Sequence, residues 1–346
     1  MQFPGQGKPP VGIVFDTGMG RGIDDALALA LLHGFVGKDE ARIASISVDN
    51  PNLKAAAYCD IVGRFYASAT TGPAAQFQRG LPIGLANGKP AADTPMLTTP
   101  LSKRNADGKL VYPTQIRDLN DTAEVAPLIR NALTAQYDQN AIVIMTGPAT
   151  NLVKVLELHD TKDLIARKVK FAVFNGGAYP DGPADFNVQT DIAAAKKLFA
   201  EWPTPIVAAG NEIGDALPFP ASSIEKDFAW TPNHPVVDAY RAYKSMPYDA
   251  PGWAMSAVLY AIRPQEGYFK LSDPGTISVL DDGRCRFRAT AAGKHRYLIL
   301  DPAQKQRIIG VYTEIASAKP VERKLRFPGQ QEKKDEAKPP APKPPN

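Results

Sequence analysis

The stretch VGIVFDTGMGRGIDDALALALLHGF, residues 11–35, decides the fold class. Its first part, VGIVFD (11–16), is a short apolar run that ends in a carboxylate, which is typical of a strand buried on both faces of a sheet. After a Gly-rich turn, DDALALALLHGF (24–35) is apolar on nearly every side, as expected of a helix that packs on such a sheet. The stretch therefore predicts the first strand and helix of an α/β domain.

The same alternation of apolar strands and helical segments continues along the chain. Because successive strands are joined by helices, we predict an α/β fold with a mostly parallel open sheet and helices on both faces. Near the C-terminus, GTISVLDDGRCRFRA (275–289) has a turn between two alternating runs and predicts a β-hairpin. The further predicted strands are ARIASISVDN (41–50), AIVIMTG (141–147), VKFAVFNGG (169–177) and PIVAAGNEIG (205–214).

No change of composition divides the middle of the chain, so we expect a single domain over residues 11–325. Residues 1–10 are rich in Pro and Gly and predict a flexible N-terminus. Residues 74–122 are rich in Gly, Pro, Asp and Asn and predict an insertion or lid. Residues 326–346 are charged and Pro-rich, cannot bury enough apolar surface to offset their ordering entropy, and predict a disordered tail.

Composition excludes several classes of protein. The 346 residues carry a net charge of only +4 and no basic stripe, which argues against a nucleic-acid partner. Two cysteines exclude a disulfide scaffold and a Cys-based zinc site, and no stretch of apolar residues is long enough to span a membrane. We expect a soluble protein, either cytoplasmic or exported with its signal peptide removed.

Polar side chains follow each predicted parallel strand. The carboxyl ends of parallel strands meet at one edge of a sheet, where ligands bind, so these groups should converge. Their oxygen atoms suit a polyhydroxylated ligand or a hard cation. Asp24 and Asn151 also stand where helix N-caps belong, which is the structural alternative. The residues are Asp16, Asp24, Asp25, Asp49, Asn50, Thr146, Thr150, Asn151, Asn175, Asp185, Asn187, Asn211 and Glu212.

Several segments together resemble, in order, those of the inosine/uridine-preferring nucleoside hydrolases. The first motif is similar to DTDMGNDVDDALAL of one branch of that family, and the likeness extends over about residues 11–300. The segments are DTGMGRGIDDALALALL (16–32), SVDNP (47–51), IVIMTGPATNLVKVLELH (142–159), FNGGAYPDGPADFNVQTDIAAAKKLF (174–199) and WAMSAVLYAIRPQEGYF (253–269).

The resemblance implies a calcium-dependent hydrolase that cleaves the N-glycosidic bond of ribonucleosides. In that family calcium and an aspartate of the first motif activate the attacking water. The partner would be a nucleoside or ribose-like small molecule, and a homo-oligomer is expected of some members. Carried over position by position, the roles are catalytic for Asp25 and Asp185, metal-binding for Asp25 and the Thr146 carbonyl, and ribose-binding for Asp24, Asn50, Asp185 and Asn187.

Other positions depart from the family pattern. Gly18 stands where the family has its calcium-binding base, and Ala254 stands where the last motif supplies a calcium aspartate. Arg21 replaces an asparagine and Gly22 an acidic residue. These departures predict a degenerate calcium site and leave two interpretations: an N-ribosyl hydrolase with a rearranged site, or an inactive or altered member that binds a ribose-like or other small polar ligand.

The positions of Asp249, Arg21 and Tyr179 distinguish these interpretations, and a pocket filled by Arg21 and Tyr179 would argue against catalysis. Asp249 within reach of Asp25 would favour a rebuilt metal site. Alternatively, Arg21 could place its guanidinium where the metal sits in the family, which would preserve a positive charge there. In that case Arg21 must point into the site, and Tyr179, which falls near an expected ribose-binding asparagine, would fill space beside it.

Overall fold

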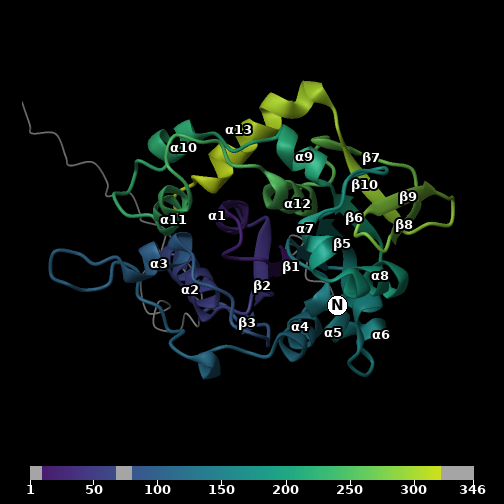
Figure 1. Cartoon of the computed structure of the whole chain (residues 1–346), viewed down its shortest axis with the longest axis horizontal. Helices are drawn as coiled ribbons and strands as arrows, with labels where there is room; N and C mark the ends of the chain where they lie inside the picture. The colour runs from purple at the N-terminus through teal and green to yellow at the C-terminus, as the bar shows by residue number, and fades with distance from the viewer. Residues whose placement is uncertain (1–9, 68–79, 321–346) are drawn as a thin grey trace, which may run out of the picture.

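The computed structural model describes residues 10–67 and 80–320. The expected flexible N-terminus, apart from residue 10, and the expected tail at 326–346 lie outside the described residues. Within them, one sheet runs through the molecule with helices around it (Figure 1).

The sheet has the order β3-β2-β1-β4-β5-β6-β10-β8-β9, and the pairs from β3 to β10 along this path are parallel. The predicted, mostly parallel open sheet is therefore confirmed. Its strands are β1 (Val11–Thr17), β2 (Ala41–Val48), β3 (Ile83–Leu85), β4 (Ala141–Met145), β5 (Val169–Asn175), β6 (Ile206–Ala209), β7 (Phe269–Leu271), β8 (Gly275–Val279), β9 (Cys285–Ala289) and β10 (His295–Leu300).

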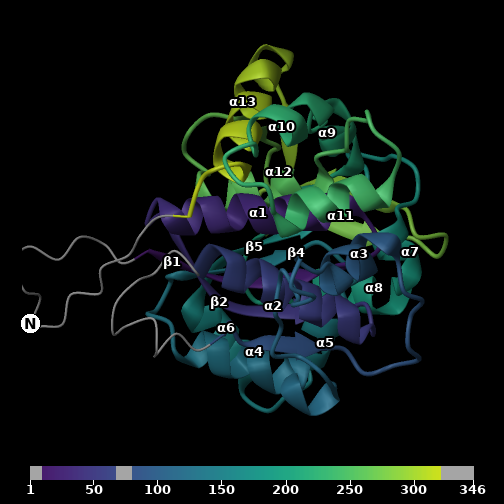
Figure 2. The ribbon, with the colours of Figure 1, turned by 90° about the vertical axis from the view of Figure 1, so that its left-hand side faces the viewer.

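Helices cover both faces of the sheet. Neighbouring strand residues point to opposite sides, so a strand that is apolar at successive positions presents apolar side chains to both layers of helices. In β1, Ile13 and Phe15 join the core beneath α1 (Ile23–Gly37) and α12 (Trp253–Ile262), whereas Val14 joins the core beneath α4 (Val125–Thr134), α5 (Thr150–Leu156) and α8 (Ile192–Glu201). Figure 2 shows α1 and α12 on one side of the strands and α4 and α5 on the other. This two-sided burial explains why the strands read as continuous apolar runs.

The remaining helices surround these layers. In α1, nearly every residue from Ile23 to Phe35 is buried, which accounts for its apolar sequence. The helices that surround the central layers are α2 (Leu53–Ala67), α3 (Pro95–Ser102), α6 (Thr161–Lys168), α7 (Phe186–Thr190), α9 (Asn211–Ala216), α10 (Ala221–Lys226), α11 (Pro235–Tyr243), α13 (Lys305–Ala316) and the short 3-10 helices η2 (Leu119–Asp121) and η3 (Pro302–Gln304).

The C-terminal part completes the sheet. β8 and β9 pair antiparallel from Gly275↔Ala289 to Val279↔Cys285, which confirms the predicted hairpin. β10 then inserts between β6 and β8, and α13 returns to pack on α1. At that contact Gly34 lies so close to α13 that an added Cβ would stand 2.0 Å from the Ile315 carbonyl oxygen.

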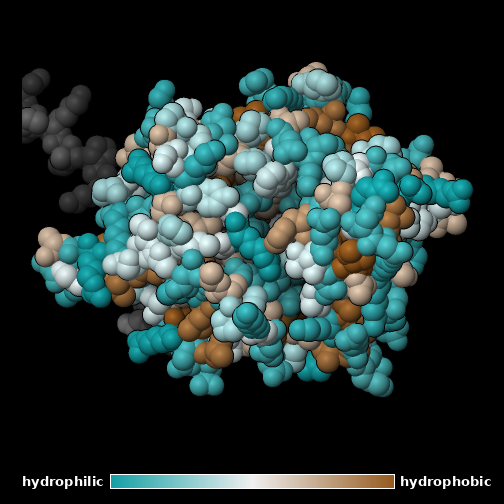
Figure 3. All heavy atoms as spheres, in the orientation of Figure 1, coloured by the Kyte–Doolittle hydropathy of each residue, from teal (hydrophilic) through white to brown (hydrophobic). Residues whose placement is uncertain are grey.

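Part of the segment expected to be an insertion or lid belongs to the described residues. Residues 83–85 form β3, the edge strand beside β2, and α3 packs on α11. The visible face in Figure 3 is mostly polar, with apolar residues gathered only in small groups. No helix within residues 10–67 and 80–320 is both long enough and apolar enough to cross a membrane.

Candidate functional site

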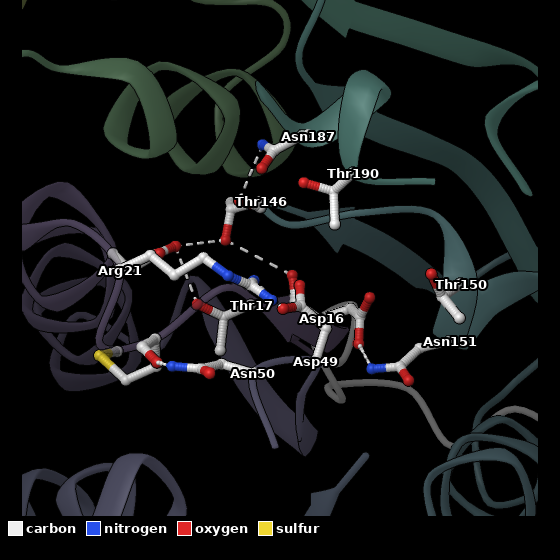
Figure 4. Close-up of polar contacts among 12 residues, drawn as sticks. Asp16, Thr17, Arg21, Asp49, Asn50, Thr146, Thr150, Asn151, Asn187 and Thr190 are labelled. Carbon is white, nitrogen blue, oxygen red and sulfur yellow. Dashed lines mark hydrogen bonds and ion pairs between the residues drawn. The ribbon is translucent and has the colours of Figure 1, made fainter. Parts of the chain in front are cut away.

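Polar side chains converge at the carboxyl ends of β1, β2 and β4, which are neighbours at the centre of the sheet (Figure 4). The register aligns Asp16 of β1 with Ser47 of β2 and Met145 of β4. Because parallel strands place their ends at one edge, Asp49 and Thr146, which follow β2 and β4, come close to Asp16. The predicted convergence at this edge is therefore present.

Arg21 points into this cluster and forms an ion pair with Asp49. The Asp49 side chain is 2% exposed and the Arg21 side chain 27%. Burial holds the pKa of Asp49 well above its ordinary value, while the positive charge of Arg21 opposes that shift. The Arg21 side chain therefore lies at the site, as the guanidinium hypothesis requires.

Asp16 is fully buried and accepts hydrogen bonds from Ser47 Oγ at 2.5 Å and Asn151 Nδ2 at 2.9 Å. Burial raises its pKa to about 7, against the lowering effect of these two bonds and of Arg21. Asn151 makes no capping bond to its own helix, α5, so the N-cap alternative does not describe it. Its amide supports Asp16 instead.

Asp25 lies beside the same group. Its Oδ1 accepts from Thr17 Oγ1 at 2.8 Å and from Thr146 Oγ1 at 2.5 Å. Burial raises the pKa of Asp25 to about 6, and the two hydroxyls and Arg21 act in the opposite direction. Asp25 is thus held by hydroxyl donors at the base of the cluster.

Asp24 is half-buried and faces another element. Its carboxyl accepts a hydrogen bond from the backbone N–H of Ala254, in the first turn of α12, and burial together with Asp25 raises its pKa to about 8. The backbone N–H groups of Asp24 and Asp25, in the first turn of α1, also donate to it, although the N-cap position itself is Gly22. A Cβ at Gly22 would stand 2.4 Å from Asp24 Oδ1, so the missing side chain there leaves room for this carboxyl.

The segment containing Asp185 and Asn187 forms the opposite rim. Asp185 caps α7 by accepting from Val188 N at 3.0 Å, its Oδ2 accepts from Asn211 Nδ2 at 3.0 Å, and burial raises its pKa. Asn187 Nδ2 donates to the carbonyl oxygens of Thr146, at 3.1 Å, and Asn175, at 3.0 Å. Both residues therefore lie at the same edge as Thr146.

The other residues named from the sequence have structural partners. Asn50 donates to the Met19 carbonyl at 3.0 Å, within the turn after β1. Asp249 accepts from the backbone N–H of Ala221 at 2.8 Å, so its recorded contact is at the start of α10 and not at Asp25. Tyr179 is buried against Tyr297, with ring centroids 5.4 Å apart.

Further residues of the site were missed in the sequence. Thr17 and Ser47 donate to aspartates from within strands, and no spacing signal separates them from ordinary strand hydroxyls. Phe186, between the two rim residues, is 60% exposed, and the Arg21 Cζ lies 5.8 Å from the centre of its ring. An exposed aromatic ring at a polar edge was not readable from the motif alone.

A parallel α/β sheet with polar side chains at its carboxyl edge is the architecture of a ligand-binding α/β protein. The family described as inosine-uridine preferring nucleoside hydrolase matches residues 13–316, and the chain belongs to this family. No curated protein matches the chain.

Solved structures show the same fold at low sequence identity. An inosine-guanosine nucleoside hydrolase is 17% identical with a TM-score of 0.64, covering 88% of this chain and 98% of its own. The inosine-uridine preferring enzyme from Bacillus anthracis is 16% identical with a TM-score of 0.61, covering 89% and 99%. The type III effector XopQ, solved with adenosine diphosphate ribose, is 13% identical with a TM-score of 0.58, covering 90% and 95%.

The family implies a calcium ion, but the residues at this edge do not fit one. Positions 18 and 254 offer no side-chain oxygen. The Thr146 carbonyl already accepts from Asn187, and Asp25 Oδ1 accepts from two hydroxyls. Over residues 10–67 and 80–320, no group of three or more His, Cys, Asp and Glu side chains is placed to hold a metal. Asp16 Oδ2 and Asp49 Oδ2 have no hydrogen-bond partner among the described residues, but these few oxygens fall short of the six to eight that calcium requires.

Proposed function

We propose that this chain binds a ribonucleoside or a related ribose-containing ligand at the edge formed by Arg21, Asp24, Phe186 and Asn187. The observation that carries the proposal is the accessibility of these groups beside the buried aspartates. Arg21 is 27% exposed along its side chain, Asp24 and Asn187 are half-buried, and Phe186 is 60% exposed. They are the groups that an incoming ligand would meet first.

The chemistry of this edge suits such a ligand. A carboxyl group, protonated or ionised, accepts hydrogen bonds from sugar hydroxyls, and a guanidinium or amide donates to their oxygens. The exposed Phe186 ring offers an apolar face to a base. Family membership supports a nucleoside as the ligand class. The ADP-ribose in the XopQ structure extends that class to ribosyl phosphates as probes.

Binding is favoured over calcium-dependent hydrolysis because the hydrolytic groups are missing or occupied. Gly18 supplies no base, and loss of a general base typically removes about 10²–10⁴ in rate. Asp25, the remaining aspartate of the implied ligand set, is engaged by the hydroxyls of Thr17 and Thr146. The degenerate site is thus proposed to retain ligand binding without the family's metal-activated water.

One observation favours a second candidate, metal-free hydrolysis of the N-ribosyl bond. The pKa of the half-buried Asp24 is raised to about 8, so this carboxyl holds a proton at neutral pH. A protonated carboxyl can act as a general acid on a leaving group. This candidate requires Asp24 to face the leaving base when ribose occupies the edge.

Isothermal titration of the full chain with inosine, uridine, ribose and ADP-ribose, in the presence of EGTA, tests the first candidate. We expect saturable binding of at least one ribosyl ligand, weakened about tenfold or more by Phe186→Ala. The matched control is Tyr137→Ala, which removes an aromatic side chain that is 71% exposed elsewhere. No binding by any probe, or equal effects of the two substitutions, would refute the proposal.

Reducing-sugar release in the same EGTA buffer tests the second candidate. Turnover that disappears in Asp24→Asn, with ligand affinity retained, would support metal-free hydrolysis. Binding without sugar release would reject it and leave the binding proposal intact.

A further inference from the structure

We propose that the Arg21 guanidinium is a built-in cation that takes the place of the family's metal ion, so that this edge is charge-balanced without calcium. The inference concerns how the site is held together and does not depend on which ligand it binds. It rests on the position of Arg21, on the missing side chain at Gly18, and on the donors that surround the same oxygen atoms.

The position of the guanidinium is fixed relative to Gly18. A Cβ built on Gly18 would lie 3.1 Å from Arg21 Nη1, 3.3 Å from Asp25 Oδ2 and 3.7 Å from the Thr146 carbonyl oxygen. Asp25 and the Thr146 carbonyl are the positions to which the family resemblance assigns metal binding. The Arg21 guanidinium, Asp25 and the Thr146 carbonyl therefore surround the space that a side chain at position 18 would enter.

Gly18 and Arg21 depart from the family pattern as one coupled change. A contact of 3.1 Å is tighter than ordinary van der Waals contact, and an aspartate at position 18 would extend its carboxylate further into the same space. Arg21 can thus occupy its position because residue 18 has no side chain. The backbone assists, since Arg21 N–H donates to the Gly18 carbonyl at 3.1 Å and the turn carries Arg21 back over Gly18.

A second glycine, Gly147, leaves space for Asp49, the ion-pair partner of Arg21. A Cβ on Gly147 would lie 1.5 Å from Asp49 Oδ2, so any side chain there would displace the buried carboxylate from its place beside Arg21. The guanidinium pairs directly with Asp49, and Asp25 Oδ2 faces the same space around position 18. One cation set among several carboxylates is the role that a metal ion would have.

Two oxygen atoms at the positions implied to bind metal, Asp25 Oδ1 and the Thr146 carbonyl, accept hydrogen bonds from the protein itself. Thr17 and Thr146 donate to Asp25, and Asn187 donates to the Thr146 carbonyl. A calcium ion binding here would have to displace the guanidinium and these donors together. Arg21, the hydroxyls and the amide therefore form a metal-free equivalent of the coordination shell.

Calcium titration of the full chain tests the inference, with calorimetry, terbium luminescence and the thermal midpoint in calcium or EGTA as readouts. For the wild type we expect no saturable binding below about 1 mM and the same Tm in both buffers, because an ion at about 1,000 times its Kd would raise Tm by several degrees. Binding of calcium by the wild type in the micromolar range would overturn the proposal.

A rebuilt site provides the matched comparison. The triple variant Gly18→Asp/Arg21→Asn/Ala254→Asp restores the implied ligands and removes the guanidinium. The control, Gly18→Asp/Arg64→Asn/Ala254→Asp, keeps Arg21 and instead breaks the Arg64–Asp60 pair, whose side chains are 29% and 5% exposed. We expect the first variant to bind calcium at least about 100-fold more tightly than the second. Equal affinities would contradict the proposal, and if either variant fails to fold by circular dichroism, the wild-type titration alone decides.

Discussion

Replacing Arg21 with Met should leave the Asp49 carboxylate buried without its partner. Asp49 is 2% exposed along its side chain, its Oδ1 is paired with Arg21, and its Oδ2 has no hydrogen-bond partner among the described residues. Breaking a buried ion pair by removing one partner costs about 3–5 kcal/mol. Because Arg21 is 27% exposed, solvent screens part of the interaction, and we expect a loss of about 2–3 kcal/mol.

Urea unfolding at pH 7 measures this loss, and a double-mutant cycle with Asp49→Asn isolates the coupling between the two residues. The control is Arg64→Met with Asp60→Asn. Asp60 keeps the Thr114 hydroxyl and the Gln115 N–H as donors when Arg64 is removed, so that loss should stay near 1 kcal/mol. An Arg21→Met loss no larger than that of Arg64→Met, or a 21/49 coupling below about 0.5 kcal/mol, would refute the reasoning.

Further predictions concern pH, packing and the support of the cluster. Burial lowers the pKa of His33 from 6.5 to about 3. Below pH 6.5 only the unfolded chain gains the proton, so the free energy of unfolding falls as pH falls. The loss reaches about 2.7 kcal/mol by pH 4.5. His33→Phe should recover that amount between pH 7.5 and 4.5 in urea unfolding, and an unchanged pH slope would contradict it. Gly34→Ala drives a Cβ against a backbone carbonyl of α13 and should cost about 1–3 kcal/mol in thermal unfolding, whereas Gly310→Ala, with nothing within 4 Å, should not destabilise. Asn151→Ala removes a donor to buried Asp16 and should cost about 1–3 kcal/mol, with Asn151→Asp worse because it adds a like charge; unfolding curves that overlay the wild type would refute this.

The fold was predictable because its signals are local and repeated. The run from Val11 to Asp16 is apolar on both faces, and β1 indeed lies at the centre of a sheet covered on both sides. The DDG turn at 281–283 likewise gave the β8–β9 hairpin. By contrast, the insertion of β10 between β6 and β8 joins segments far apart in sequence, and nothing in the local pattern of HRYLIL indicates those neighbours.

The location of the site could be predicted from the sequence, but the hydrogen-bond partners of its residues could not. Strand ends identified Asp16, Asp49 and Thr146, because parallel strands bring their carboxyl ends together. The partners of these residues depend on side-chain directions that spacing does not encode. Asp24 and Asn151 stand at helix starts, yet Asp24 also binds the first turn of α12, and Asn151 binds Asp16 of β1. The departures at Gly18 and Arg21 could be read from the motif, but their close approach required the structure.

The measurement that tests the central claim most directly is a crystal structure of the wild-type chain soaked with terbium and calcium, with anomalous differences recorded at the terbium edge. We predict density for the Arg21 guanidinium against Asp49 and no anomalous peak between Asp25 and the Thr146 carbonyl. An anomalous peak at that point, with Arg21 turned away from Asp49, would contradict the account.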